Sequence, residues 1–361
     1  RGETTSFRIR NGDSLRYIKM LNGTAIDLEA NCAYVRIHEC KVDKTIEFKI
    51  DNYVDICSDG EVVGVEIIEL ISVLSAPLIA GADVEEWHSD IEEAVLVSRS
   101  LVLQDLMKSG ISPSLVNSNI VLACHITGVY DVNRNTTLDH DHYELVRAWA
   151  ESISEKQLQG IIFHNNFTLE TCEKFTNEYI SFLKIEYNNQ YNPNVYRYFV
   201  YQDFLKQHIQ FFKSIFVTDI TDVTLVNNPF IDPYFIENPT SIFCGDEPKT
   251  LNNDWMRDHS TNLRNNISNY AEYESKFGSE TLLNCGVIGS KAPIFFDFIK
   301  KLCAIHEYVN SANQTAFTGD MGAFNYLART QFNRNLRYGT PVNTVFKNYE
   351  NERQDCWFRH K

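Results

Sequence analysis

The sequence contains no uninterrupted apolar run of about 18 residues and no pair of cysteines in a Cys-x-x-Cys arrangement. A membrane-spanning helix needs about 20 consecutive apolar residues, so no such helix is expected. The N-terminal stretch also lacks the apolar region and cleavage site of a secretory signal peptide. We therefore expect a cytoplasmic protein whose nine cysteines are reduced and hold no zinc.

The sequence has fewer basic than acidic residues. The 33 Lys and Arg residues are outnumbered by 48 Asp and Glu residues, which gives a net charge of −15. Such a charge repels phosphate backbones and anionic membranes, so strong binding to a nucleic-acid backbone is not expected. Hydrophobic residues make up 43% of the 361 residues, which excludes wholesale disorder, and the length suggests two domains.

Residues 1–75 predict a small antiparallel β module. Apolar and polar residues alternate with a period of two in four short segments, and an Asp59-Gly60 turn precedes the last one. These segments are residues 33–37, 45–50, 53–56 and 62–68. The pattern resembles a small bacterial module of unknown function. That resemblance implies a surface for partner binding, scaffolding or self-association, and no chemistry.

Residues 76–116 are expected to link two domains through a helix. Between residues 83 and 110 the apolar residues recur near a spacing of 3.6, and acidic residues gather in the first turns. The sequence ends this pattern with Lys108-Ser-Gly110, which is typical of a helix C-terminus.

Residues 117–361 predict an α/β domain. Apolar strand segments alternate with helical ones, which favours a mostly parallel sheet with ligands at the carboxyl ends of its strands. The predicted strands are residues 120–126, 160–164 and 214–219, and the predicted helices are residues 142–154, 169–185 and 200–212. The loop after the first strand lacks G-x-G-x-x-G, so a dinucleotide-binding fold is not supported.

Two carboxylates follow the third predicted strand of this domain, in the segment Asp219-Ile-Thr-Asp222. Like charges this close repel each other unless they cap a loop or hold a cation. Hard divalent ions such as Mg²⁺ or Mn²⁺ take carboxylate ligands and leave coordination positions for substrate oxygens. From these residues alone, a pair of loop-capping Asp residues and a metal site are both open.

Three motifs in this domain resemble those of GT-A glycosyltransferases and occur in the same order. Asp219-Ile-Thr-Asp222-Val resembles the acidic metal-binding motif, in a D-x-x-D variant of the DxD motif. Asn284-Cys-Gly286-Val-Ile-Gly resembles their N-x-G-x-x-G segment, and Asp320-Met-Gly-Ala-Phe-Asn resembles their D-Q-x-x-x-N segment. The resemblance implies an α/β, GT-A-like mostly parallel sheet flanked by helices, preceded here by the small antiparallel β domain and the linking helix.

The resemblance also implies which residues carry a reaction. A divalent cation is expected on Asp219, Asp222 and His360, where it stabilises the leaving diphosphate as a Lewis acid. Asp320 and Asn284 are the expected catalytic residues. The residues expected to bind the nucleotide-sugar donor are Thr127, Gly128, Arg134, Arg197, Gly286 and Lys361.

Asp320 has two open roles. In an inverting enzyme, a carboxylate deprotonates the acceptor hydroxyl. In a retaining enzyme, it stabilises an oxocarbenium-like centre or acts as a nucleophile, and the segment resembles retaining enzymes more closely. Met321 stands where family members often carry Gln, so an amide that binds sugar hydroxyls is missing and the donor sugar stays unassigned.

The function implied is a metal-dependent glycosyltransferase that moves a sugar from a nucleoside-diphosphate donor, a UDP-sugar, to an unidentified acceptor. The acceptor is left open among a glycan, a lipid-linked glycan, a protein and a nucleobase, because loops outside the resemblance determine this specificity. The first alternative is a catalytically silent GT-A-like domain that binds or scaffolds a partner. The second is a metal-dependent phosphohydrolase or nuclease, which the net charge of −15 disfavours.

Overall fold

The computed structural model describes most of the chain, and the chain divides into two compact units, Arg1–Asn117 and Ser118–Lys361. Each unit is considered by itself. Among the described residues, no helix has the length and apolar character needed to cross a membrane. The described residues are 5–11, 14–20, 25–27, 32–49, 52–59, 61–68, 94–95, 98, 115, 118–131, 136–309 and 319–361.

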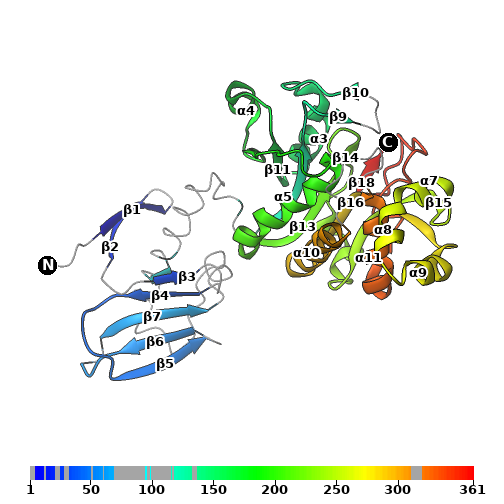
Figure 1. Ribbon diagram of the computed structural model, residues 1–361. Coiled ribbons are helices and arrows are strands. Elements are labelled where there is room, and N and C mark those ends of the chain that lie inside the picture. Colours follow the sequence, from blue (N-terminus) through cyan, green and yellow to red (C-terminus); the bar gives the residue numbers. More distant parts are fainter. Residues whose placement is uncertain are drawn as a thin grey trace. The chain divides into compact units, whose positions relative to one another are not determined.

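The N-terminal unit contains the predicted antiparallel sheet, and its five strands have the order β3-β4-β7-β6-β5 (Figure 1). Val35, Val54 and Val65 lie side by side across the sheet and are buried, as the period-two pattern predicts. The strands of this unit are β1 (Thr5–Asn11), β2 (Ser14–Met20), β3 (Ala25–Asp27), β4 (Cys32–Arg36), β5 (Lys44–Lys49), β6 (Asn52–Ile56) and β7 (Val62–Ile68).

The predicted linking helix falls almost entirely outside the described residues. Within its span, positions 94, 95 and 98 are described as helical and position 115 as a short turn of 3₁₀ helix. Ala94 and Val95 are buried.

The C-terminal unit is built on a seven-stranded mixed sheet with the order β12-β11-β8-β13-β16-β15-β17. Every strand runs in the same direction except β16, which is antiparallel to both of its neighbours. The α/β prediction is confirmed at this level. The strands are β8 (Ser118–His125), β11 (Gln159–His164), β12 (Ile180–Lys184), β13 (Phe212–Thr218), β15 (Ile242–Thr250), β16 (Thr281–Lys291) and β17 (Leu336–Tyr338).

Helices cover both faces of this sheet (Figure 1). Trp149 of α3 packs with Val121 and Phe216 in an aromatic-rich core on one face. On the other face, Phe163 contacts Tyr201 of α5, and α5 packs against α10. The helices are α3 (Glu144–Glu155), α4 (Leu169–Phe175), α5 (Pro193–His208), α6 (Pro233–Ile236), α7 (Asp254–His259), α8 (Thr261–Asn266), α9 (Tyr270–Phe277), α10 (Ala292–Tyr308) and α11 (Asp320–Gln331).

The predicted helix over residues 169–185 is wrong beyond its first two turns. Thr168 caps α4, which ends at Phe175. The side chain of Asn177 then accepts hydrogen bonds from two backbone N–H groups, those of Tyr179 (2.8 Å) and Ile180 (3.0 Å). This turn redirects the chain into β12, a parallel edge strand whose first residue, Ile180, is buried beside Gly160.

The strand order reverses beside β8. The chain moves from β8 to β11 and β12 on one side, and it returns through α5 to place β13 on the other side. When two neighbouring parallel strands are followed by connections that lead to opposite sides, a crevice opens at the carboxyl ends of these strands. Ligands bind in such crevices in open α/β sheets. The indole N–H of Trp149 donates to the Thr218 hydroxyl (2.7 Å) at the end of β13. A ligand-binding site is therefore expected at this edge of the sheet.

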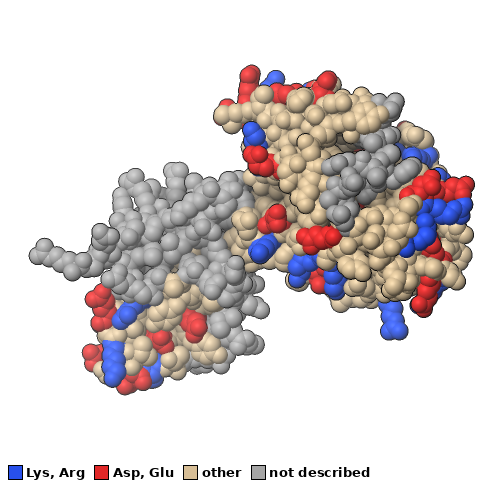
Figure 2. Space-filling view, viewed as in Figure 1, with Lys and Arg blue, Asp and Glu red and all other residues tan. Residues whose placement is uncertain are grey.

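Charged side chains of both signs are interspersed on the face of the C-terminal unit shown in Figure 2. The visible surface of this unit carries acidic and basic groups close together, as the moderate charged fraction of 22% suggests. Long-range steering of ligands by a field of one sign is thus not indicated on this face.

Candidate functional site

The predicted acidic loop lies at the carboxyl end of β13. Strand β13 ends at Thr218, and the chain enters the short strand β14 (Val223–Leu225) four residues after Asp219. β14 pairs antiparallel with β18 (Phe358–His360), so that Val223 lies opposite His360. The C-terminal strand therefore delivers His360 to the acidic loop, although the two segments are distant in sequence.

Asp219, Asp222 and His360 form a compact cluster. The His360 Nε2 atom lies 3.7 Å from Asp219 Oδ2 and 4.0 Å from Asp222 Oδ2. One ligand atom from each residue lies within 4.8 Å of the others. Carboxylate oxygens combined with an imidazole nitrogen suit divalent ions of the Mn²⁺ type. The two carboxylates are about 30% exposed, so a substrate can reach a cation held there.

His360 has the properties of a metal ligand. It is 1% exposed, and neither of its ring nitrogens makes a hydrogen bond to the described residues. Burial lowers the pKa of His360 to about 4, against the opposing effect of Asp219, so the ring is neutral at pH 7. A buried polar ring without hydrogen bonds is costly, and a neutral imidazole is the form that binds metals. The cluster thus fits a divalent cation.

The backbone of His360 is fixed by Thr344. The Thr344 hydroxyl accepts a hydrogen bond from the His360 N–H (2.8 Å) and donates to the His360 carbonyl (3.2 Å). The ring of Phe346 covers the imidazole at a centroid distance of 4.2 Å. Position and ring orientation are therefore set before any ligand arrives.

Gly286 on β16 lies directly against this cluster. A Cβ atom at this position would lie 2.8 Å from Asp219 Oδ2 and would overlap the His360 ring. Its carbonyl accepts the Asp219 N–H at 2.8 Å. The absence of a side chain at Gly286 is what lets Asp219 and His360 approach each other.

Arg197 connects the cluster to Asp320. The helix that carries it, α5, begins at an Asn192 cap and a Pro at its first position, so Arg197 emerges near the strand ends. Its guanidinium forms an ion pair with Asp219 and lies 3.9 Å from Asp320 Oδ2. Burial opposes its charge, but Tyr198 and Asp219 hold the pKa of Arg197 well above its ordinary value. The guanidinium of Arg197 therefore bridges the carboxylates of Asp219 and Asp320.

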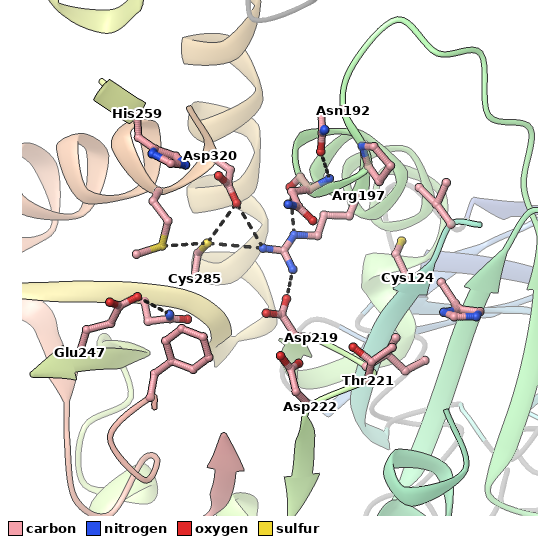
Figure 3. A pocket seen from close by; sticks show the side chains of 18 of the residues that line it. Cys124, Asn192, Arg197, Asp219, Thr221, Asp222, Glu247, His259, Cys285 and Asp320 are labelled. Carbon is pink, nitrogen blue, oxygen red and sulfur yellow. Dashed lines mark hydrogen bonds and ion pairs between the residues drawn. The ribbon is translucent and has the colours of Figure 1, made fainter. Parts of the chain in front are cut away.

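Asp219, Asp222, Arg197 and Asp320 line a cleft of about 430 Å³. In Figure 3, Asp219 and Asp222 lie between two walls, one labelled by Cys124 and Asn192 and the other by Glu247, His259 and Asp320. The first wall contains the end of β8 and the apolar residues Ile126, Val129 and Leu138, together with Asn192 and Asn194 at the start of α5. We call it the β8 wall. The second wall combines Glu247, Lys249, Trp255, His259, Asn284, Cys285, Asp320 and Met321.

Asp320 and Asn284 both lie in the second wall. Asp320 is the first residue of α11 and is 7% exposed, where the positive end of the helix dipole favours its charge. Asn284 is 5% exposed, and its side-chain amide is occupied. It accepts from the Gly286 N–H (2.7 Å) and donates to Glu247 Oε1 (2.9 Å), so it positions Glu247 at the cleft.

Three other predicted donor-binding residues, Thr127, Gly128 and Lys361, are described and are not among the residues that line the cleft. Thr127 is 1% exposed, and its backbone N–H and carbonyl are both bound by the Asn165 side chain at 3.0 Å. Gly128 adopts a positive φ of 75° in the turn that follows. Lys361 is exposed, and its backbone N–H donates to the Asp222 carbonyl (3.0 Å). Arg134 lies outside the described residues.

Several cleft residues were not predicted from the sequence. Glu247 and Lys249 lie on β15. Lys347 follows Phe346 in the loop over His360 and adopts a positive φ of 65°. Trp255 lies on α7 and also lines the cleft. None of these residues belongs to a recognisable motif.

The sequence matches no protein-family model, and no curated protein matches it significantly. A function for this chain therefore rests on its own residues and their geometry.

Proposed function

We propose that the C-terminal unit is a metal-dependent glycosyltransferase with a GT-A-like fold, which uses a nucleoside-diphosphate sugar as donor. The observation that carries the proposal is the Asp219, Asp222 and His360 cluster at the carboxyl edge of the sheet. Residues of all three motifs that resemble the glycosyltransferases line one cleft around it. A silent scaffold would have no need for a neutral, buried histidine between two carboxylates.

The two walls of the cleft suit the two ends of such a donor. The β8 wall offers apolar contacts from Ile126, Val129 and Leu138 beside amide groups, which suits a nucleobase such as uracil. At the opposite wall, the carboxylate of Asp320 suits the hydroxyls of the donor sugar. A diphosphate at the cluster would span the two, and a UDP-sugar is our first choice.

The chain's own groups prepare the cleft for transfer. A divalent cation bound there would supply Lewis-acid stabilisation of the leaving diphosphate. Arg197 holds Asp219 in place and offsets the charge of Asp320, and Lys249 and Lys347 add positive charge at the cleft. Asp320 is then available to stabilise positive charge on the donor's anomeric carbon, as a retaining mechanism requires.

The test is thermal stability with UDP-, GDP- and CDP-sugars, each with and without Mn²⁺. A ligand at 100 times its dissociation constant stabilises a protein by about 2.7 kcal/mol. We expect one nucleotide to raise the melting temperature, and only when Mn²⁺ is present. If folded protein shows no shift with any donor, the transferase proposal is wrong and a scaffold role takes its place.

A further inference from the structure

An aromatic pair forms part of the second wall of the cleft. Trp255 and His259 lie one turn apart on α7, and their rings stack with centroids 3.5 Å apart and an interplanar angle of 29°. His259 is 4% exposed, and its Nδ1 atom contacts the Trp255 carbonyl at 3.0 Å. Because the imidazole covers one face of the indole, the surface that Trp255 exposes belongs to its other face and its edge.

The exposure of Trp255 is unusual among the described tryptophans. Trp255 is 39% exposed, whereas Trp149 and Trp357 are 1% exposed and belong to the core. Leaving an indole in water forfeits much of the free energy that its burial would provide. A rigid indole in the wall of a cleft, stacked on a buried ring, is pre-organised to receive a flat apolar surface.

The second wall also carries hydrogen-bonding groups. Glu247 and Asp320 supply carboxylate oxygens, Asn284 holds Glu247 in place, and Lys249 supplies an amine. Figure 3 shows the side chains of His259, Asp320 and Glu247 on the same side of Asp219 and Asp222. The wall therefore combines one aromatic face with several acceptors for hydroxyl groups.

This combination matches the surface of a sugar ring. A pyranose presents polarised C–H groups on a face, which the negative face of an indole attracts, and hydroxyls around its rim, which carboxylates accept. A nucleobase also has a flat face, but the amide-rich and apolar β8 wall suits it better. A peptide carries a fixed carbonyl acceptor for each backbone N–H donor, whereas sugar hydroxyls can rotate to donate to both carboxylates.

We propose that the acceptor is itself a carbohydrate, whose terminal sugar stacks on Trp255 and directs its hydroxyls toward Glu247 and Asp320. The inference rests on the proposed function, in which the donor's nucleotide occupies the β8 wall, its diphosphate the metal cluster, and its sugar the space beside Asp320. In the transfer, the acceptor hydroxyl oxygen bonds to the donor's anomeric carbon. The bond from that carbon to the diphosphate oxygen breaks, and the hydroxyl proton passes to the departing diphosphate.

The test measures binding of neutral oligosaccharides, namely maltose, cellobiose, lactose and chitobiose, in the presence of Mn²⁺ and UDP. Saturation-transfer NMR and titration calorimetry are applied to the full chain and to Trp255→Ala, Trp255→Leu and Trp255→Phe. Tyr308→Ala is the matched control, because Tyr308 is 72% exposed on α10 and does not line the cleft. Circular dichroism checks the fold of each variant.

We expect saturable binding of at least one oligosaccharide to the unmodified protein and to Tyr308→Ala. Binding should weaken about tenfold in Trp255→Ala and Trp255→Leu, because both remove the aromatic face, and by about threefold or less in Trp255→Phe. Leu keeps apolar bulk at the position, so weaker binding by Trp255→Leu would reflect the missing ring and not a collapsed cavity.

Three results would overturn the inference. They are no saturable oligosaccharide binding, equal binding by Trp255→Leu, and Trp255-dependent binding of a nucleoside such as adenosine in place of sugars. The nucleotide shift with Mn²⁺, measured on the same samples, keeps the two proposals apart. A shift without oligosaccharide binding removes the carbohydrate acceptor alone. Trp255-dependent oligosaccharide binding without any shift supports the sugar platform and contradicts the transferase.

Discussion

A substitution of Asp222 tests metal binding at the cluster most directly. Asp219 also forms the ion pair with Arg197, so changing it disturbs two interactions at once. Asp222→Asn keeps the shape of the side chain and removes one negative charge from the cluster. We expect the Mn²⁺-dependent nucleotide shift to disappear, because a neutral amide is a much weaker ligand for a hard cation than a carboxylate. Differential scanning fluorimetry with a Mn²⁺ titration measures this.

The control is Asp203→Asn, which removes the same charge from an exposed position on α5 that does not line the cleft. It should leave the shift unchanged. The melting temperature of Asp222→Asn without metal should match that of the unmodified protein or exceed it, since repulsion with Asp219 is relieved. An unchanged Mn²⁺ dependence in Asp222→Asn would show that the cluster does not hold the cation.

Lys347 is expected to contribute to nucleotide affinity. It lines the cleft beside the cluster, with its amine 4.9 Å from the Phe346 ring centroid. Lys347→Met keeps the stem and removes the charge, so the affinity for the nucleotide should fall about threefold to tenfold, and less at high salt. Lys300→Met is matched, because Lys300 lies 4.9 Å over the Phe296 ring and does not line the cleft. Equal loss in both variants would contradict a direct role.

His306 gives a prediction for pH dependence. It is fully buried on α10 and stacks on Tyr198, and burial lowers its pKa to about 4, partly opposed by Asp320. The folded pKa is below the unfolded value of about 6.5, so the unfolded chain binds the proton more readily between these values. His306 therefore costs no stability above pH 6.5 and destabilises the fold as the pH falls toward 4.

Urea unfolding at pH 7 and pH 5 measures this effect. The unmodified protein should lose about 2 kcal/mol more of its free energy of unfolding across this range than His306→Phe, which keeps a ring against Tyr198 but does not titrate. Other buried histidines, including His164 and His360, titrate in both proteins, so the difference reports on His306. Parallel losses in the two proteins would contradict the assignment.

Strand β16 is expected to control the geometry of the metal cluster through Gly286. In Gly286→Ala, the added methyl group must displace Asp219 or His360, because it would lie within contact distance of both. We expect the Mn²⁺ midpoint of the nucleotide shift to rise about tenfold and the free energy of unfolding to fall by about 1 to 3 kcal/mol.

Gly160→Ala on β11 separates these two effects. Its added methyl group would meet Ile180, Ile153 and Trp149 at 3.0 to 3.1 Å, in the core and away from the cluster. It should lower stability by a comparable amount and leave the Mn²⁺ midpoint unchanged. If Gly160→Ala shifted that midpoint as much as Gly286→Ala does, the effect would reflect stability alone.

Local patterns predicted part of the sheet: β8, β11 and β13 overlap the predicted strand segments, whereas β12, β15, β16 and β17 were not predicted. Strand β13 was predicted because a short apolar run is typical of a buried strand, whereas the residues alone left the role of the two carboxylates after it open. The placement of Asp219 and Asp222 at the carboxyl edge followed from the parallel sheet. Strand β12 was missed because the turn at Asn177 outweighs the helical spacing around it.

The rest of the site depends on contacts between distant segments. His360 meets the acidic loop through the pairing of β14 with β18, a register that no local pattern specifies. Glu247 lies on the polar end of β15, where the strand leaves the core and reaches the cleft. The stacking of Trp255 on His259 depends on the orientation of α7. Such features follow from tertiary packing and not from sequence periodicity.

The division of the chain into two units gives a prediction for the molecule as a whole. The large core cluster lies entirely within Ser118–Lys361 and runs from Val121 to Phe358. All members of the metal cluster and every residue that lines the cleft belong to the same unit. A unit of this size buries enough apolar surface to be stable without help.

We therefore expect residues 118–361, expressed alone, to unfold cooperatively and to keep the Mn²⁺-dependent nucleotide shift. Thermal melts of the fragment and of the full chain, with and without the nucleotide and metal, provide the comparison. An equal shift in the two would assign donor binding to the C-terminal unit and leave the N-terminal sheet for partners or self-association. A fragment that folds but loses the shift would mean that the N-terminal unit contributes to donor binding, since the cleft residues are all present in the fragment.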